Sequence, residues 1–147
     1  MTFSGILWLW PATKRWWERG SKQTFGANQA SDGTLRLMAL LFVLMQPKAR
    51  RPKVLILDEP ELGLHPAAIR LVAERVAAAA EEGTQVILAT QSPLFLDHFT
   101  DDQVVVLDRV GRETTARRLT AEELREWREE YSLAELWEKN ILGGYPH

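Results

Sequence analysis

The string VLILDEPELGLHP at residues 54–66 is the feature of this sequence that most constrains its fold. Its first four residues are apolar, and a short apolar run of this kind predicts a strand that is buried on both faces of a sheet. Asp58 and Glu59 follow at the carboxyl end of that strand, where open α/β sheets place their ligand chemistry. The backbone turns at the strand's end, so both carboxylates can reach one crevice. The string therefore predicts an α/β sheet with an acidic pair at its edge.

Two neighbouring carboxylates at this position suit two different tasks. One can hold a hard cation such as Mg²⁺, directly or through water, while the other polarises a water for attack on phosphorus. This is the pattern of a Walker B motif. The alternative is a strand that simply ends at an acidic turn, because Asp, Glu and Pro are common there. The whole thirteen-residue string favours the Walker B interpretation.

A second candidate site precedes this strand, where QASDGTLR is followed at once by the apolar run LMALLFVLM. Ser31 or Asp32 can cap a helix over residues 34–44, and Gly33 lets the backbone approach a ligand closely. The N-terminus of such a helix offers unpaired N–H groups and a positive dipole end, which together suit a phosphate. A capped core helix without a ligand is the alternative. The position just ahead of the acidic strand favours the phosphate site.

The other elements follow from turn, capping and periodicity signals. A strand, a helix and a second strand from residue 54 to residue 89 imply a right-handed parallel crossover. The closing helices are predicted to be amphipathic, the first around Leu124 and Trp127 and the second around Leu136 and Trp137. In chain order, the predictions are a strand at 6–10, a loop with one short element at 13–28, helices at 34–44 and 66–82, buried strands at 54–58 and 84–89, a short helix at 92–98, paired strands at 103–108 and 114–119 around Gly111, and two helices that begin at capping boxes 120–123 and 132–135.

Composition and charge exclude several classes of function. The chain has no cysteine, which excludes disulfides and thiolate metal sites. Its net charge of −2 gives no global attraction to nucleic acid, and the basic loop at 47–53 is better interpreted as a solvated linker than as a DNA contact. The longest apolar run, residues 37–45, is too short to cross a bilayer, and no basic residue precedes the apolar part of residues 1–10. We therefore expect a cytoplasmic protein with no membrane partner.

Six tryptophans, four of them before residue 18, are unusual for an N-terminal segment. Large aromatic side chains need a surface that buries them. They either pack on this domain's own sheet or contact a preceding part of the protein.

Taken together, the strings SDGTLR, VLILDEPELGLHP, ATQSPLFLD and LREWREEYSLAELWEKNILGG resemble the C-terminal half of an ABC-type AAA ATPase of the RecF-like and SMC-like group. The resemblance implies the C-terminal lobe of a P-loop ATPase head, a mostly parallel α/β sheet flanked by helices, in a family whose heads sandwich ATP in pairs. It also implies three parts: an N-terminal edge at 1–28, an ATPase core lobe at 29–119, and a C-terminal helical tail at 120–147. The expected cofactors are ATP and Mg²⁺.

The same resemblance implies roles for single residues. In this family the signature motif contacts the γ-phosphate of a nucleotide held by the opposite head, and the D-loop crosses the interface between heads. Carried over by motif, the assignments are signature residues Ser31, Asp32 and Gly33, the Mg²⁺-associated Asp58, the catalytic Glu59, the D-loop from Glu61 to His65, and the switch residue Gln91.

Two departures from the family pattern qualify these roles. The switch residue is usually His in transporter-type ABC ATPases, whereas Gln91 can hydrogen-bond a phosphate or water but cannot carry charge. No string in the chain matches G-x-x-x-x-G-K-[ST], the Walker A loop that makes the main β- and γ-phosphate contacts. The expectation is a truncated product, a fragment or one part of a split protein, which binds ATP weakly or not at all by itself.

Three functions are compatible with these observations. The first is ATP binding and Mg²⁺-dependent hydrolysis as part of an ATPase head that pairs with a second head, in a homodimer or with a complete homologue, and reaches DNA through other domains. The second is a non-catalytic module that docks on a complete ATPase subunit. The third, which nothing in the sequence assembles beyond its first pair, is a metal-dependent hydrolase that uses Asp58, Glu59, His65, Asp97 and His98.

Overall fold

The computed structural model describes residues 15–17, 24–26 and 29–144 of the 147-residue chain. The strand predicted at 6–10 lies outside these residues. The stretch predicted to be a loop with one short element contains two short antiparallel strands, β1 (Arg15–Trp17) and β2 (Thr24–Gly26). Within the described residues, no helix is long and apolar enough to cross a membrane.

Helix α1 (Asp32–Leu44) carries the predicted phosphate site at its N-terminus. Ser31 is the N-cap, and its Oγ accepts a hydrogen bond from the backbone N–H of Thr34 at 3.1 Å. The helix therefore begins slightly earlier than the pattern of apolar residues alone predicts, because the cap residue and not the first apolar residue determines where it starts.

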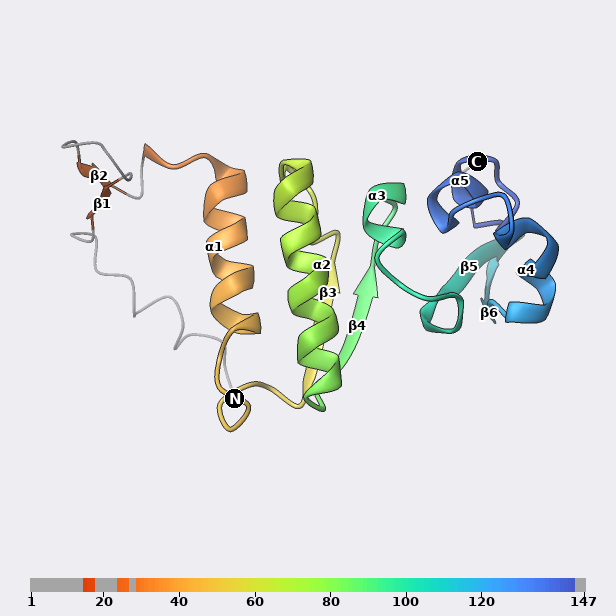
Figure 1. Cartoon of the computed structure of the whole chain (residues 1–147), viewed down its shortest axis with the longest axis horizontal. Coiled ribbons are helices and arrows are strands. Elements are labelled where there is room, and N and C mark those ends of the chain that lie inside the picture. The colour runs from red at the N-terminus through yellow and green to blue at the C-terminus, as the bar shows by residue number, and fades with distance from the viewer. Residues whose placement is uncertain (1–14, 18–23, 27–28, 145–147) are drawn as a thin grey trace.

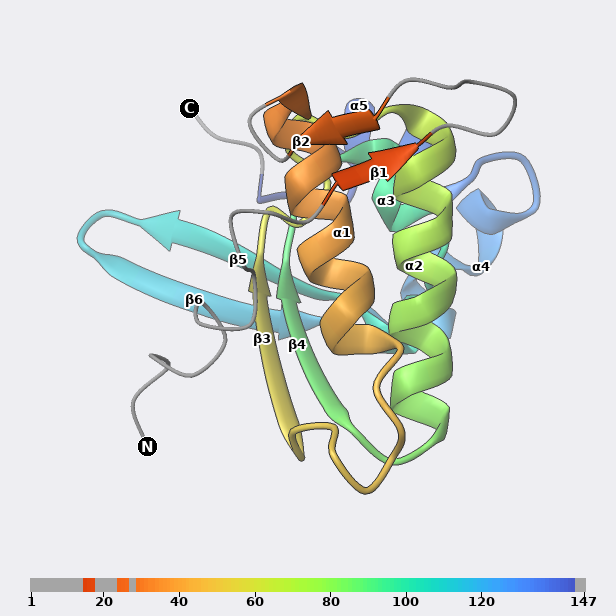
Figure 2. The same ribbon diagram turned by 90° about the vertical axis from the view of Figure 1, so that its left-hand side faces the viewer.

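The predicted parallel crossover is confirmed by strands β3 (Val54–Asp58) and β4 (Gln85–Ala89), which helix α2 (Pro66–Glu81) connects. Their register aligns Asp58 with Ala89, so both strands end at the same edge. Helices α1 and α2 run side by side and pack on one face of this pair of strands (Figures 1 and 2). The core between them is centred on Val72 and Phe95, both 0% exposed.

The predictions that β3 is buried on both faces and that β4 is a second buried strand were wrong for one face of each strand. Alternate side chains face the helices, but Ile56 is 73% exposed and Ile87 is 52% exposed. The described helices cover only one face, and an uninterrupted apolar run cannot reveal whether one face or both will be covered. The second face of the β3–β4 pair is therefore an exposed apolar surface.

The C-terminal part forms its own small core. Strands β5 (Val105–Val110) and β6 (Glu113–Arg118) pair antiparallel across the predicted turn. The described strands thus form three two-stranded sheets in all, and among these only the β3–β4 sheet is parallel. This differs from the mostly parallel sheet expected, because β5 and β6 pair with each other across a short turn. Helices α4 (Ala121–Arg128) and α5 (Leu133–Glu138) begin at the two predicted capping boxes. Leu136 is 0% exposed in this core, whereas Trp127, expected on the apolar face of α4, is 43% exposed.

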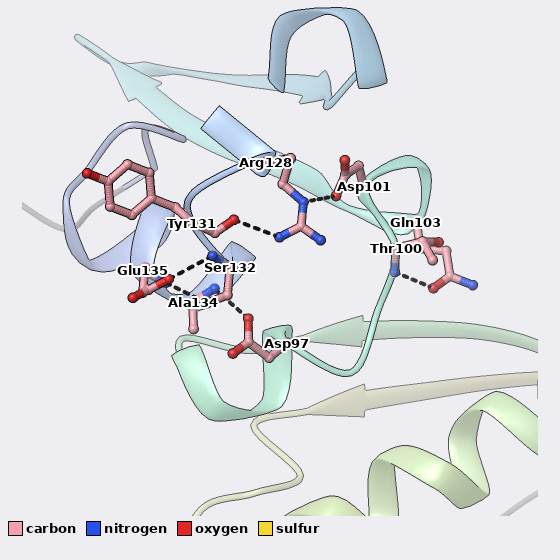
Figure 3. Close-up of polar contacts among 9 residues, drawn as sticks. All are labelled: Asp97, Thr100, Asp101, Gln103, Arg128, Tyr131, Ser132, Ala134 and Glu135. Carbon is pink, nitrogen blue, oxygen red and sulfur yellow. Dashed lines mark hydrogen bonds and ion pairs between the residues drawn. The ribbon is translucent and has the colours of Figure 1, made fainter. Parts of the chain in front are cut away.

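Polar contacts attach this part to the rest of the lobe. After helix α3 (Pro93–Leu96), Asp97 accepts a hydrogen bond from the backbone N–H of Ala134 at the start of α5, at 2.8 Å (Figure 3). Arg128 of α4 forms an ion pair of 3.1 Å with Asp101, which opens the short 3₁₀ helix η4 (Asp101–Gln103). These contacts hold the C-terminal helices next to the segment that follows β4.

Candidate functional site

Three segments meet at the carboxyl edge of the β3–β4 pair: the loop at residues 59–65, residues 90–92 after β4, and the first turn of α1. Asp58 ends β3 with its side chain exposed, and Glu59 follows with its side chain partly buried. The backbone N–H of Glu59 donates to the carbonyl oxygen of Ala89 at 2.9 Å. This bond extends the parallel pairing one residue past the strand and holds the start of the loop against the end of β4.

Glu59 and Gln91, both predicted to be catalytic, lie together in the structure. The Nε2 group of Gln91 donates to Oε1 of Glu59 at 3.3 Å. Glu59 also has a backbone φ of 41°, in the left-handed region that side chains with a Cβ rarely adopt. Such a conformation costs on the order of 1 kcal/mol and persists only where the surrounding structure imposes it. The acidic pair thus lies on a strained turn that the end of β4 holds in place.

A second contact joins the loop to β4 and involves a residue to which the sequence analysis gave no role. The hydroxyl of Thr90 donates to Oε1 of Glu61, and the hydroxyl oxygen of Thr90 accepts a hydrogen bond from the backbone N–H of Ser92 at 3.0 Å. Glu61 was predicted to belong to the D-loop, and here it also anchors that loop to the neighbouring strand. The available signal for Thr90 was its position directly after the second strand, at the same edge as the acidic pair.

The signature segment contacts the loop from the other side. A Cβ added to Gly33 would come within 3.0 Å of the carbonyl oxygen of Gly63, a separation that real side chains essentially never show, and within 3.2 Å of its carbonyl carbon. Arg36, one turn further along α1, donates from Nη1 to the carbonyl oxygen of Leu62 at 2.9 Å. Gly33 therefore allows the close contact with the loop, a role beyond the phosphate approach predicted for it from the sequence. Arg36 was missed.

His65 has a local structural contact. Its Nδ1 accepts a hydrogen bond from the backbone N–H of Ala67 at 3.2 Å, which makes it the N-cap of α2. Pro66 takes the first helical position, where its missing N–H is not needed. His65 thus fixes the point at which the loop ends and the helix begins.

The donor set at this edge fits one divalent cation only if phosphate oxygens or waters complete the coordination. Across residues 15–17, 24–26 and 29–144, no group of three or more His, Asp or Glu residues is placed to hold a metal. Mg²⁺ usually takes one or two carboxylates together with substrate phosphates, and the exposed Asp58 can serve in that way. The alternative of a metal-dependent hydrolase is not supported, because the five residues proposed for it form no metal-binding group in the described part of the chain. Asp97 instead accepts a hydrogen bond from the backbone N–H of Ala134 in α5.

Comparison with known proteins agrees with this arrangement. Residues 9–97, more than half of the chain, match the family model described as "AAA domain, putative AbiEii toxin, Type IV TA system". The chain belongs to this AAA family. The resemblance to ABC-type and SMC-like ATPases predicted from the sequence is thereby confirmed for that part of the chain.

Two curated relatives and one solved structure extend the comparison. The "Old nuclease" of Escherichia phage P2 is 34% identical over half of this chain, and a "putative ABC transporter ATP-binding protein" of Bacillus thuringiensis subsp. konkukian is 30% identical over 65% of it. The chain spans only 12% and 16% of the lengths of these two relatives. A solved structure from work on ATP-driven dimerization and DNA-stimulated activation of SMC ATPases is similar to this chain, with a TM-score of 0.58 and 20% sequence identity. The superposition covers 74% of this chain and 66% of the chain in that structure. The α/β fold is thus that of a P-loop NTPase.

Proposed function

We propose that this chain is the Walker B lobe of an ABC-type ATPase head, in which ATP is bound with Mg²⁺ and hydrolysed. The main support for the proposal is that Asp58, Glu59 and Gln91 lie together at one edge of two parallel strands. The capped N-terminus of α1 lies next to the loop at residues 59–65 that follows Asp58. The family match supports nucleotide chemistry at this edge. The lobe thus supplies the metal-binding and water-orienting groups of a shared site.

Each residue of the acidic edge then has a separate task. Mg²⁺, when bound, neutralises charge on the phosphates and orients them. Asp58 is exposed and would hold the ion. Glu59 has one oxygen bonded to Gln91 and would use the other to accept a proton from the attacking water. Gln91 is neutral, so it would orient Glu59 through a hydrogen bond and add no charge of its own to the site.

The phosphates themselves require further groups. We propose that a Walker A loop from another segment or another subunit holds the β- and γ-phosphates, because no string of the printed sequence matches that loop. Ser31, Asp32 and Gly33 would face a nucleotide held by a second head, since the side chains of Ser31 and Asp32 are exposed at the N-terminus of α1. The loop from Glu61 to His65 would lie at the interface between the heads. Any contact with DNA would come through other domains.

The direct test combines the chain with a homologous protein that carries the phosphate-binding loop. We expect the mixture to hydrolyse ATP only with Mg²⁺ present. Glu59→Gln should leave ATP affinity unchanged and lower kcat by about 10² to 10⁴, the usual contribution of a positioned general base. Glu81→Gln, which makes the same chemical change at the far end of α2, is the matched control and should leave kcat unchanged. Equal turnover with Glu59→Gln would refute the role of Glu59.

A second candidate function, docking on a complete ATPase subunit without catalysis, is favoured by the uncovered face of the β3–β4 pair. Val54, Ile56 and Ile87 are 48%, 73% and 52% exposed there, although strands of a parallel pair are normally covered on both faces. If docking is the function, the chain will change the activity of a complete homologue. Ile56→Glu will abolish that change, whereas Glu59→Gln will not. The opposite pattern supports catalysis.

A further inference from the structure

We infer that Arg36 is a positioning residue that couples the start of α1 to the loop at residues 59–65, and through that loop to Glu59. The inference rests on the proposed function for the meaning of Glu59, but not for the contact itself. Arg36 is the last residue of the string SDGTLR, in which roles were predicted only for Ser31, Asp32 and Gly33. Its guanidinium has no place among the groups proposed to touch nucleotide, so it would act only through the loop.

The contact is made to the backbone of the loop. Nη1 of Arg36 donates to the carbonyl oxygen of Leu62 at 2.9 Å. The other bonds of Leu62 are local, since its N–H donates to the carbonyl oxygen of Glu59 at 3.1 Å. Arg36 is therefore connected to Glu59 through two hydrogen bonds of Leu62. A displacement of Leu62 would shift the backbone of Glu59, the residue that carries the carboxylate.

Gly33 makes this contact possible. The absence of a side chain at Gly33 lets the first turn of α1 rest on the carbonyl group of Gly63. Residues three apart on a helix share a face. Gly33 accordingly contacts the carbonyl group of Gly63, and Arg36 donates to the adjacent carbonyl group, that of Leu62. Gly63 itself has a φ of +77°. One steric contact and one charged hydrogen bond thus hold the same two peptide groups.

The opposite side of the loop is attached to β4. Glu59 is bonded through its N–H to Ala89, and Glu61 through its side chain to Thr90. The loop at 59–65 is consequently held between α1 and the end of β4, with Arg36 providing the side-chain hydrogen bond on the α1 side. A force applied to the N-terminus of α1, as a bound phosphate would apply, reaches Glu59 through this connection.

Amide hydrogen exchange of the whole chain tests the coupling without nucleotide. Arg36→Met keeps the aliphatic stem and removes the donors, and we expect exchange at the amides of Leu62 and Leu64 to rise about tenfold, the effect of losing a charged hydrogen bond. Arg36→Lys can still donate one bond but lacks the fork geometry, so it should restore part of the protection. Arg70→Met, a change at an exposed arginine of α2, is the matched control and should leave both amides unchanged.

Unchanged exchange at Leu62 and Leu64 in Arg36→Met overturns the inference. So does a rise spread equally over α1, α2 and β3, because that pattern means general destabilisation. If Arg36→Met does not fold, the Lys variant decides in the same way. In the reconstituted ATPase, Arg36→Met should lower kcat several-fold with KM for ATP unchanged. If the unaltered chain gives no turnover there, the proposed function fails while the exchange result still decides the role of Arg36.

Discussion

Replacing Gly33 by Ala tests how closely α1 approaches the loop at 59–65. The added Cβ would come within 3.0 Å of a backbone carbonyl oxygen, that of Gly63, which cannot rotate away as a flexible side chain could. Overpacking of this kind costs about 1–3 kcal/mol. Alanine favours the helix over glycine by about 0.5–1 kcal/mol. The net expectation is a loss of about 1–2 kcal/mol in the free energy of unfolding, or a fall in Tm of roughly 3–8 °C.

Thermal unfolding followed by circular dichroism, with urea titration beside it, measures this change. Ala39→Gly on the same helix isolates the propensity contribution and should cost about 0.5–1 kcal/mol without any clash. We expect Gly33→Ala to lower the free energy of unfolding, although its effect on helix propensity has the opposite sign. A Tm equal to or above that of the unaltered chain would refute the close approach of α1 to Gly63.

The remaining predictions concern the cap, the acidic pH range and the core. Ser31→Ala removes the acceptor for the N–H of Thr34 and should cost about 1 kcal/mol in thermal unfolding. In the ATPase reconstituted with a homologous protein, sedimentation should show weaker ATP-driven pairing of the heads, while the nucleotide affinity of a single head is unchanged. Hydrogen bonds from the side chain and backbone of Thr120, with Arg117 nearby, lower the pKa of Glu123. The contribution of Glu123 to stability is therefore present above its ordinary pKa and is lost as the pH falls. In unfolding titrations, Glu123→Gln should lose less stability between pH 7 and acidic pH than the unaltered chain. Phe95→Ala, at a side chain that is 0% exposed, should cost about 3–5 kcal/mol by urea unfolding.

Signals that act within a few residues allowed the sequence to predict much of the fold. The cap at Ser31 and the first-turn proline at Pro66 locate two helix starts, and Thr120 and Ser132 locate two more. These positions are predictable because the bonds involved span only two or three residues. The common edge of the two parallel strands follows from the same local signals, since a parallel connection needs a helix between the strands.

Contacts between distant segments could not be predicted in the same way. The bonds from Arg36 to Leu62 and from Thr90 to Glu61 depend on how two loops and a helix meet in space. Arg36 ends the string SDGTLR, but nothing in that string indicates that its side chain reaches a carbonyl group 26 residues further along the chain. The exposure of Ile56 was likewise not predictable, because an apolar run indicates only that a surface can be covered.

The left-handed backbone of Glu59 has a consequence for protein engineering. At a φ of 41°, glycine or asparagine would be tolerated better than glutamate, by on the order of 1 kcal/mol. A library of variants selected only for thermal resistance should therefore accumulate replacements at this position. Such selection would discard the carboxylate proposed to orient water. Replacements at residue 59 should therefore be tolerated well when variants are scored by stability and poorly when they are scored by ATP turnover, and we expect this difference to be largest at residue 59.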